Sequence, residues 1–552
     1  MNAIIVALIL LVELLVAKDI KIDRQYTVVN PIDKRDLLTS LEDADTLSEW
    51  APVSSSIGSN QTQFYEFVVN TTHTGVGDYY EILIFLSGNI CSLPNGLSST
   101  SDDELDETLK VYYTFNQTAV DNGISGLDYF SFSDGYLQGL ISNPTADPFS
   151  NLYILVVSPI IDDLQSNWTY EIGISQNDLV FQWDDRSWAN LVDADDNSAL
   201  FITGNLTVDL NGESYNSDIY DLYIFDYEDK DYFDGLNKSW CAVRNGPALL
   251  TSQNMTRSLQ HRNGGLQQQF YVEGLNKSTK YIVYLAQDFS GTSSGGAIFE
   301  QFEFETMDED SCKLIYDLSF CDGVSYSVPV STGFLDPSNE TAYLNMDYLS
   351  SLYDNYTAKL YESFAKAIQI ILCDDILDAR YSPIVTCDDC KASYKDWLCA
   401  VTIPRCSTRN VTGYKYREEG ASRNSFINDV IVPPQPYFEV LPCLNVCHAI
   451  VRDCPSDFSF ACPSDNRSIQ LSYYWDDVDS EYVTCNYVGD SSNGTSSTST
   501  TSSSSSSTTT TSSDSTTNNK MIRAVTANLG FKQVNMEIWI IILCWIVNLV
   551  NI

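Results

Sequence analysis

Histidine and basic side chains are scarce in this chain. Of its 552 residues only three are histidines, His73, His261 and His448, and they lie far apart in the sequence. A zinc hydrolase or a serine hydrolase would need histidines gathered with carboxylates in the fold, so all three are expected to be surface or structural residues. Lysine and arginine number 30 against 74 aspartates and glutamates, which gives a net charge of −44. This acidity excludes nucleic acid as a partner.

Long internal apolar runs are also lacking, and the apolar segments lie at the two ends. Residues 4–17 are apolar and end before Lys18-Asp19, which predicts a secretory signal peptide over 1–17. Residues 491–530 are rich in Ser and Thr and are interpreted as an O-glycosylated stalk. The apolar tail 531–552 fits a GPI-attachment signal or a short single membrane span. Either anchor predicts the extracellular face of the plasma membrane, reached through the endoplasmic reticulum.

Sequons for N-linked glycosylation are spread along the whole chain. Asn-x-Ser/Thr, with x other than proline, occurs at Asn60, Asn70, Asn116, Asn167, Asn205, Asn237, Asn254, Asn276, Asn339, Asn355, Asn410, Asn466 and Asn493. Modified asparagines must face solvent in an exported protein. The sequence therefore predicts a heavily glycosylated surface protein.

Cysteine, by contrast, is plentiful and clustered. Setting aside Cys544 in the apolar tail, an even set remains: Cys91, Cys241, Cys312, Cys321, Cys373, Cys387, Cys390, Cys399, Cys406, Cys443, Cys447, Cys454, Cys462 and Cys485. An even set fits complete pairing in an oxidising compartment, with the connectivity left open. Cys443 and Cys447 are four residues apart and share one face of a helix, so each can bridge to a different segment. The spacing predicts a small helical module stapled by disulfides, a type that mostly binds other proteins.

The rest of the chain is predominantly β. Strands are predicted at residues 64–69, 80–86, 152–157, 168–174 and 222–225. The segment Gly274 to Tyr284 resembles a fibronectin-like tyrosine corner, with Tyr281 bonding back across the turn. Apolar residues at three-and-four spacing from Leu349 to Ile371 predict an amphipathic helix. The predicted fold is multidomain: β-sandwiches at 18–205 and 206–306, dividing near 204–209, then a helical cysteine-rich domain at 307–490.

Three motifs are weak candidates for chemistry. Gly291-Thr-Ser293-Ser-Gly295 fits a nucleophile elbow but lies in an all-β stretch, and Cys387-Asp-Asp-Cys390 lacks a βαβ context. Asp193-Ala-Asp195-Asp-Asn197 starts like an EF-hand loop and then departs from it, which leaves a weaker carboxylate calcium site as an alternative. No catalytic residue, metal ligand or cofactor is predicted.

Two cysteine stretches carry a resemblance to a known module. Trp397-Leu-Cys399 to Pro404-Arg-Cys406, and Pro442-Cys443 to Cys447, resemble the frizzled-type cysteine-rich domain. Over about residues 45–490 the chain resembles the fungal stretch-activated calcium-channel component of the mating-pheromone-induced-death family. The strings that carry this second resemblance are 48–52, 87–91, 177–184, 197–200, 241–247, 378–383, 387–390 and 454–458.

The resemblance implies a plasma-membrane glycoprotein that supports calcium influx in response to pheromone, wall stress or stretch. It would work with a pore-forming subunit homologous to voltage-gated calcium-channel α1 chains. The cysteine module also resembles the ectodomain of the auxiliary subunit of the animal sodium-leak channel. We therefore expect an auxiliary extracellular subunit, with membrane attachment through the C-terminal tail and a homo-oligomer left open.

Two other functions are weighed against the auxiliary one. In the first, the chain itself forms a stretch-gated, calcium-permeable cation channel. A pore must satisfy its backbone in lipid with helices or a closed barrel, and the chain offers only a removable N-terminal segment and one short tail. In the second, it is a GPI-anchored wall-remodelling enzyme, for which a catalytic set is lacking.

One segment of the cysteine-rich domain is predicted to contact the partner. Residues 407–436 lie between two cysteines and carry Arg409, Lys415, Arg417 and Arg423 in an otherwise acidic chain. This basic cluster could meet acidic loops of the channel. The alternative is a solvated, disordered loop.

Overall fold

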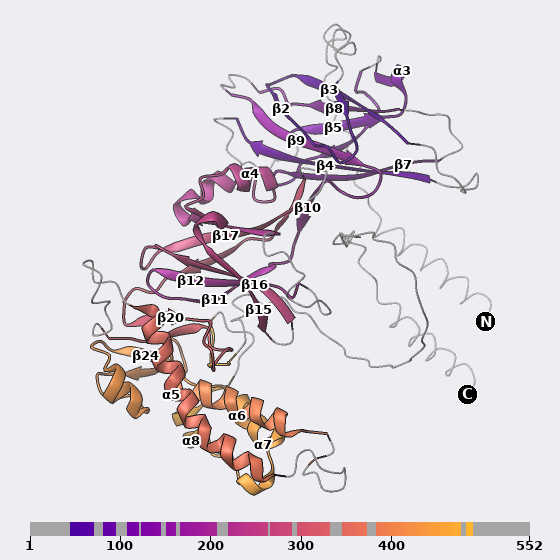
Figure 1. Cartoon of the computed structure of the whole chain (residues 1–552). Coiled ribbons are helices and arrows are strands. Elements are labelled where there is room, and N and C mark those ends of the chain that lie inside the picture. The colour runs from indigo at the N-terminus through magenta and orange to yellow at the C-terminus, as the bar shows by residue number, and fades with distance from the viewer. Residues whose placement is uncertain are drawn as a thin grey trace, which may run out of the picture.

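The structure, a computed structural model, describes residues 45–70, 81–94, 108–120, 123–144, 151–161, 166–206, 219–262, 265–289, 295–331, 345–371, 382, 384–475 and 482–488. They form two β-sandwiches and a helical, disulfide-rich unit, arranged in a row (Figure 1). This confirms the predicted fold class. The signal peptide, the stalk and the apolar tail that the sequence predicts lie outside the described residues.

The first sandwich packs a five-stranded sheet against a four-stranded one. The first sheet runs β1 (Asp45–Leu47), β3 (Thr62–Val68), β8 (Asn151–Val157), β5 (Lys110–Thr114) and β6 (Asp128–Ser131), and the short helix α3 (Gln117–Val120) follows β5. The second runs β2 (Val53–Ile57), β9 (Trp168–Ser175), β4 (Glu81–Ser92) and β7 (Tyr136–Pro144). Alternate residues of each strand, such as Ile82, Ile84 and Leu86 of β4, enter one shared core because side chains alternate across a strand.

The second sandwich also has two sheets. One runs β10 (Phe181–Asp184), β18 (Gly296–Phe299), β17 (Lys280–Asp288), β13 (Tyr220–Asp226) and β14 (Leu250–Thr251), with β19 (Phe302–Glu305) paired to β17. The other runs β11 (Ala189–Ala194), β12 (Ser198–Thr203), β16 (Gly265–Glu273) and β15 (Thr256–Arg262). Between β13 and β14 lie the 3-10 helix η3 (Tyr227–Phe233) and α4 (Trp240–Asn245), and η4 (Ser252–Asn254) follows β14.

Strand pairing places the change of sandwich earlier than the division predicted near 204–209. β10 pairs in parallel with β18, and β12 pairs with β16, so strands from residue 181 onward hydrogen-bond to later strands. Their partners lie about 70 to 115 residues away in the sequence, at Gln269 to Glu273 and Gly296 to Phe299. A pattern of alternating residues does not identify such a partner.

The predicted tyrosine corner is present at the start of β17. Tyr281 is fully buried, and its phenolic oxygen accepts a hydrogen bond from the backbone N–H of Asn276 at 2.8 Å. This bond closes the turn that leads into the central strand of the second sandwich.

The two sandwiches are joined by a disulfide and by α4. Cys91, at the end of β4, is bonded to Cys241 in α4, across 150 residues of sequence. The Ser239 hydroxyl caps α4 and also donates to the carbonyl of Ile90 at 2.7 Å. In the sequence, α4 lies between strands of the second sandwich. It is nevertheless attached to the first sandwich by the disulfide and by a hydrogen bond.

The third unit begins with the hairpin β20 (Cys312–Ile315) and β21 (Tyr326–Pro329), and its later elements are helices and short strands. These are α5 (Met346–Ala367), η6 (Ile368–Ile370), α6 (Cys387–Thr402), β22 (Arg405–Ser407), β23 (Lys415–Arg417), the π-helix η8 (Ile427–Ile431), β24 (Tyr437–Val440), α7 (Leu444–Asp453), η9 (Ser456–Phe458) and α8 (Asn466–Ser472). We refer to residues 307–488 as the cysteine-rich module.

Local sequence explains the helix starts in this module. Asn345 caps α5, and Thr386 and Asp389 form a capping box that starts α6. The amphipathic helix predicted from Leu349 to Ile371 matches α5 and η6. Among the described residues, no helix is both long enough and apolar enough to cross a membrane.

Candidate functional site in the cysteine-rich module

Disulfides organise the module. Six bridges are described in the chain, and five of them involve it: Cys312–Cys406, Cys321–Cys399, Cys390–Cys454, Cys443–Cys485 and Cys447–Cys462. Cys387 is also disulfide-bonded. Cys373 and Cys544 lie outside the described residues. All thirteen described cysteines are thus oxidised, which fits a protein of an oxidising compartment.

Helix α7 shows how the spacing of two cysteines is used. Cys443 immediately precedes the helix and Cys447 lies one turn into it. The first is bonded to Cys485 and the second to Cys462, so the two bridges lead to different segments, as the four-residue spacing predicts. The backbone of Cys443 is also bonded to Asn486, so the end of the described chain is fastened beside α7.

A buried carboxylate fixes the start of the module against α5. Asp354, only 7 % exposed, accepts the backbone N–H groups of Phe320 and Cys321, each at 2.8 Å. Cys321 is in turn bonded to Cys399 of α6. One carboxylate and one disulfide therefore hold the chain after β20 against two helices.

The EF-hand-like segment lies at the junction between the second sandwich and the module. Asp195 accepts the backbone N–H of Ser198 at 2.6 Å and that of Leu314 in β20 at 2.9 Å. Asp193 accepts the N–H of Ser327 in β21 at 2.8 Å. Both carboxylates thus satisfy backbone donors, and the weak calcium site considered as an alternative would have to displace these bonds.

Arg405 strengthens the same junction. Its side chain is 8 % exposed, its Nε lies 3.4 Å from Asp193, and it donates to the carbonyl of Val192 at 3.2 Å. The next residue, Cys406, is bonded to Cys312. The ion pair and the hydrogen bond fix the module to β11 of the sandwich, while the disulfide joins β22 to β20 within the module.

The carboxyl group of Asp196, at the same junction, has a raised pKa. Asp196 pairs with Lys313, and both side chains are largely buried. Burial raises the pKa of Asp196 above its usual range, and the lysine opposes that rise. The end of β11 and the turn that leads to β12 therefore contribute three carboxylates to the junction, those of Asp193, Asp195 and Asp196.

The basic segment 407–436 is ordered, and two of its arginines face inward. Glu439 of β24 has a side chain only 1 % exposed, and it lies between Arg417 and Arg423. Arg417 donates to it at 2.7 Å and Arg423 at 2.6 Å. The structure thus gives both guanidinium groups an internal carboxylate partner, so much of their charge is already neutralised within the module.

The other two basic residues lie nearer the surface. Arg409 pairs with Glu305 of β19 at 3.0 Å, with side-chain exposures of 32 % and 48 %. Lys415, in β23, is half-buried. Contact of this segment with a partner remains a prediction. Of its four basic residues, Arg409 and Lys415 lie nearer the surface and are better placed for such a contact.

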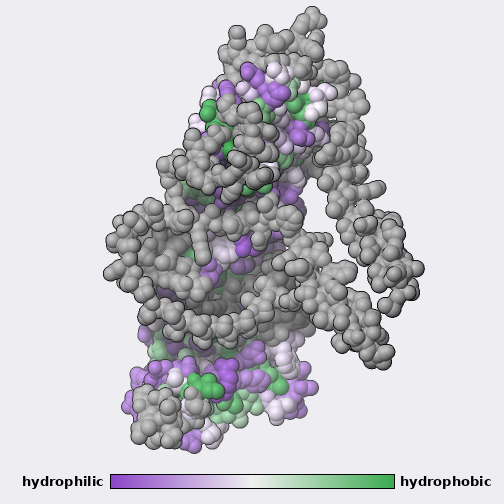
Figure 2. Space-filling model, turned by 90° about the vertical axis from the view of Figure 1, so that its right-hand side faces the viewer, coloured by the Kyte–Doolittle hydropathy of each residue, from purple (hydrophilic) through white to green (hydrophobic). Residues whose placement is uncertain are grey.

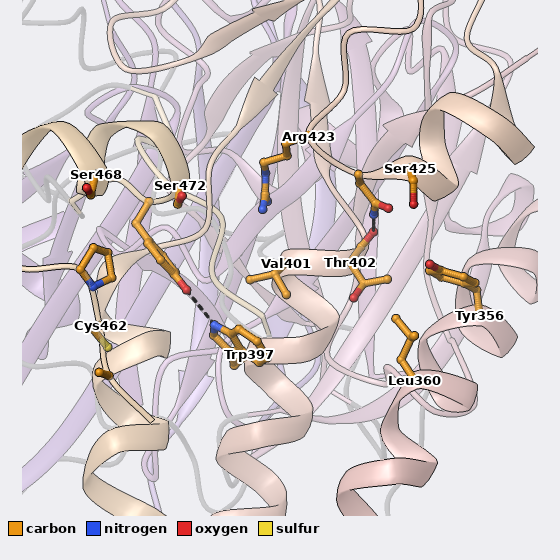
Figure 3. A pocket seen from close by; sticks show the side chains of 14 residues that line it. Tyr356, Leu360, Trp397, Val401, Thr402, Arg423, Ser425, Cys462, Ser468 and Ser472 are labelled. Carbon is orange, nitrogen blue, oxygen red and sulfur yellow. Dashed lines mark hydrogen bonds between the residues drawn. The ribbon is translucent and has the colours of Figure 1, made fainter. Parts of the chain in front are cut away.

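A cleft opens between α5, α6, α8 and the segment 423–425. It has a volume of about 720 Å³. Figure 3 shows Tyr356 and Leu360 of α5 on one side, Ser468 and Ser472 of α8 on the other, and Trp397 of α6 on the floor. The Trp397 Nε1 donates to the Tyr473 hydroxyl at 2.9 Å, which fixes both rings. The cleft mixes aromatic walls with hydroxyl and guanidinium groups.

Exposed apolar side chains are concentrated on this module. Among the described residues, 18 large apolar side chains are exposed; 12 of them lie within residues 345–488, and the others are spread over the two sandwiches. The twelve are Tyr348, Leu360, Ile370, Ile384, Tyr416, Val430, Val432, Val451, Leu471, Trp475, Tyr482 and Tyr487. Figure 2 shows apolar patches between polar ones on the lower unit. Scattered exposed apolar residues are normal in soluble proteins, and the described part of this unit has more of them than the two sandwiches.

The sequons can be placed on this framework. Asn339 and Asn493 lie outside the described residues. Of the other eleven, ten are exposed and Asn237 is half-buried. Nearly every described acceptor is thus accessible for a sugar chain, and these positions cover both sandwiches as well as α5 and α8.

The remaining candidate motifs do not form a catalytic or metal site within the described residues. His261 in β15 and His448 in α7 are exposed and far apart in the fold, while His73 and most of Gly291–Gly295 lie outside the described residues. Cys390 is bonded to Cys454, which gives it a structural role. Within the described ranges, a single cluster of metal-type side chains is found, Cys91, Cys241 and Glu171, and both sulfurs are held in a disulfide.

Comparison with known proteins shows the family of this chain. The Mid1 family, described as "Stretch-activated Ca2+-permeable channel component", matches residues 83–491. "Stretch-activated cation channel MID1" of Saccharomyces cerevisiae is 39% identical over 499 residues, covering 81% of this chain and 88% of that protein. "Stretch-activated cation channel yam8" of Schizosaccharomyces pombe is 29% identical over 447 residues, covering 79% of this chain and 87% of that protein. The resemblance seen in the sequence is confirmed, and the chain belongs to the Mid1 family of stretch-activated Ca2+-permeable channel components.

Proposed function

We propose that this chain is an extracellular, non-conducting subunit of a calcium channel, and that its cysteine-rich module docks on the outer loops of a pore-forming, α1-like subunit. The observation that carries the proposal is the distribution of exposed apolar side chains. The module has 12 of them on 152 described residues, against 6 on the 208 described residues of the rest of the chain. Water-exposed apolar area is what a protein partner would bury.

The rigidity of the module supports the same role. Five disulfides and the buried Glu439, Asp354 and Asp195 fix its surface loops. A surface that is already ordered loses little conformational entropy on binding, which favours a stable complex. The two sandwiches, with most of the exposed sequons, then project away from the contact.

The test is co-purification with the pore-forming subunit from detergent, measured together with calcium uptake in cells that carry both chains. Val430→Asp and Val451→Asp place a charge on side chains that are 46% and 44% exposed on the module. The matched control is Val68→Asp on the first sandwich, where the valine is 63% exposed. We expect both module variants to reach the cell surface but to lose co-purification and uptake, while the control keeps both.

Full co-purification of both module variants would refute docking through this surface. A second candidate function, that the chain itself conducts cations, is favoured by the names of the two relatives. Reconstitution of the purified chain alone in pure lipid separates the two, because only the second predicts a stretch-gated current there.

A further inference from the structure

The cleft between α5, α6 and α8 has the chemistry of a carbohydrate site. We propose that it binds two or three units of a neutral oligosaccharide. Its volume of about 720 Å³ falls within the roughly 300–1,000 Å³ of small-molecule sites. Of the exposed apolar side chains assigned to the channel partner only Leu360 lines this cleft, and the carbohydrate proposal does not depend on that assignment.

Its aromatic walls are held in place before any ligand arrives. The ring of Tyr356 is stacked on Phe426, with centroids 4.1 Å apart and planes at 12°. Trp397 and Tyr473 are tied by the hydrogen bond at 2.9 Å. The C–H face of a sugar ring packs on such an aromatic surface, and a fixed ring gives up little entropy when it does so.

Three hydroxyl groups in the cleft make no side-chain hydrogen bond within the part of the chain that the structure describes. They belong to Thr402, whose residue is 5% exposed, to Ser472, which is half-buried, and to Ser425, which is exposed. Because they line an open cleft, these hydroxyls are available to a ligand. A sugar hydroxyl can both donate and accept, so it matches such groups directly.

Other ligand classes fit less well. An acyl chain would leave the Thr402 hydroxyl and the serine hydroxyls unpaired against hydrocarbon. A strongly anionic ligand would find one cation in the lining, Arg423, whose Nε already lies 2.6 Å from Glu439. The remaining N–H groups of Arg423 point toward the cleft (Figure 3) and can donate to a neutral oxygen.

A protein partner is disfavoured by the two sequons that border the cleft. Asn355 precedes Tyr356 on α5, and Asn466 lies two residues before Ser468 on α8, and both asparagines are exposed. Sugar chains attached there would flank the opening and obstruct a large surface, while a free oligosaccharide could still enter.

The test uses the full-length glycoprotein after enzymatic trimming of its N-glycans. Saturation-transfer NMR and calorimetry measure binding of two probes: an N-acetylglucosamine trimer, representing the core of N-linked glycans, and a β-linked glucose trimer, representing matrix polysaccharide. We expect one of the two to bind, and which one identifies the source of the ligand. An acidic tetraglutamate peptide and sodium dodecanoate represent the rejected classes.

Variants connect the binding to the cleft. Thr402→Val removes one hydroxyl and should weaken binding about fivefold, equivalent to one hydrogen bond of about 1 kcal/mol. Ala461→Trp fills the cleft without removing any polar contact and should abolish binding. Ser351→Ala, on the exposed face of α5 outside the cleft, is the matched control and should change nothing.

Secretion and the disulfide content of each variant show whether it has folded, and Ala461→Trp keeps the test open if Thr402→Val does not fold. The proposal is overturned if neither sugar binds the trimmed glycoprotein. It is equally overturned if the peptide or the fatty acid binds in their place, or if Ala461→Trp binds sugar as the unsubstituted chain does.

Discussion

The ion-pair cluster around Glu439 provides a sharp test of how the cysteine-rich module is stabilised. Glu439→Gln keeps the size of the side chain but removes its charge. Glu439 is 1% exposed and accepts from Arg417 and Arg423 at 2.7 and 2.6 Å. The substitution leaves two guanidinium groups close together without a counter-charge. Removing one partner of a buried pair costs about 3–5 kcal/mol.

The exposure of the arginines sets where in this range the loss should fall. Their side chains are 17% and 25% exposed, so water can solvate them partly after the substitution. We therefore expect the lower limit, about 3 kcal/mol. For a unit of about 150 residues, each kcal/mol lowers the unfolding midpoint by about 2–4 °C, which gives a fall of about 6–12 °C.

The matched control is Glu305→Gln. Glu305 pairs with Arg409 at 3.0 Å, but the two side chains are 48% and 32% exposed. A surface pair contributes about 0–1 kcal/mol, so the midpoint should fall by less than about 4 °C. Scanning calorimetry of the secreted full-length glycoprotein, with its disulfides intact, measures both variants. Equal shifts for the two substitutions would show that burial does not decide the strength of these pairs.

Three other predictions concern different parts of the chain. Tyr281→Phe removes the partly buried hydrogen bond to the backbone N–H of Asn276, so the second sandwich should lose about 0.5–1.5 kcal/mol in calorimetry; an unchanged midpoint would contradict this. Cys443→Ala combined with Cys485→Ala opens one bridge without leaving a free thiol, and should lower the surface level of the protein severalfold in flow cytometry, since a native disulfide contributes about 2–5 kcal/mol; normal levels would count against it. The hydrogen bond from Arg452 lowers the pKa of Asp453. The stabilisation of the folded state by this carboxylate is therefore fully present above the unfolded pKa of about 3.9 and is lost as the pH falls through the folded pKa. Asp453→Asn should make the melting temperature fall less steeply below about pH 5, and an unchanged slope would contradict this.

Much of the fold could be predicted because local patterns report local structure. The predicted strands at 64–69 and 152–157 correspond to β3 and β8, since alternation reveals a half-buried strand. Tyr281 follows a turn sequence that is itself local, and the spacing of Cys443 and Cys447 reports one turn of helix. Each of these signals lies within about ten residues.

The features that escaped prediction depend on distant partners. Arg417 and Arg423 look like a basic surface patch until Glu439 is folded between them. Asp193 and Asp195 resemble calcium ligands, but they bind backbone groups of β20 and β21 more than a hundred residues later. The cleft is assembled from four separate segments, and its hydroxyl residues carry no signal in the sequence alone.

The positions of the disulfides along the chain limit how far the chain can be extended by a pulling force. With all bridges closed, the shortest covalent route from residue 45 to residue 488 runs through 45–91, 241–312, 406–390, 454–443 and 485–488. This route is about 150 residues long instead of about 440, so at about 3.5 Å per residue its limit is about 500 Å rather than about 1,500 Å. Residues 92–240 lie off the route and carry no tension. A pull between the ends would therefore stretch the region from Cys241 to Cys312 most and leave much of the first sandwich unloaded.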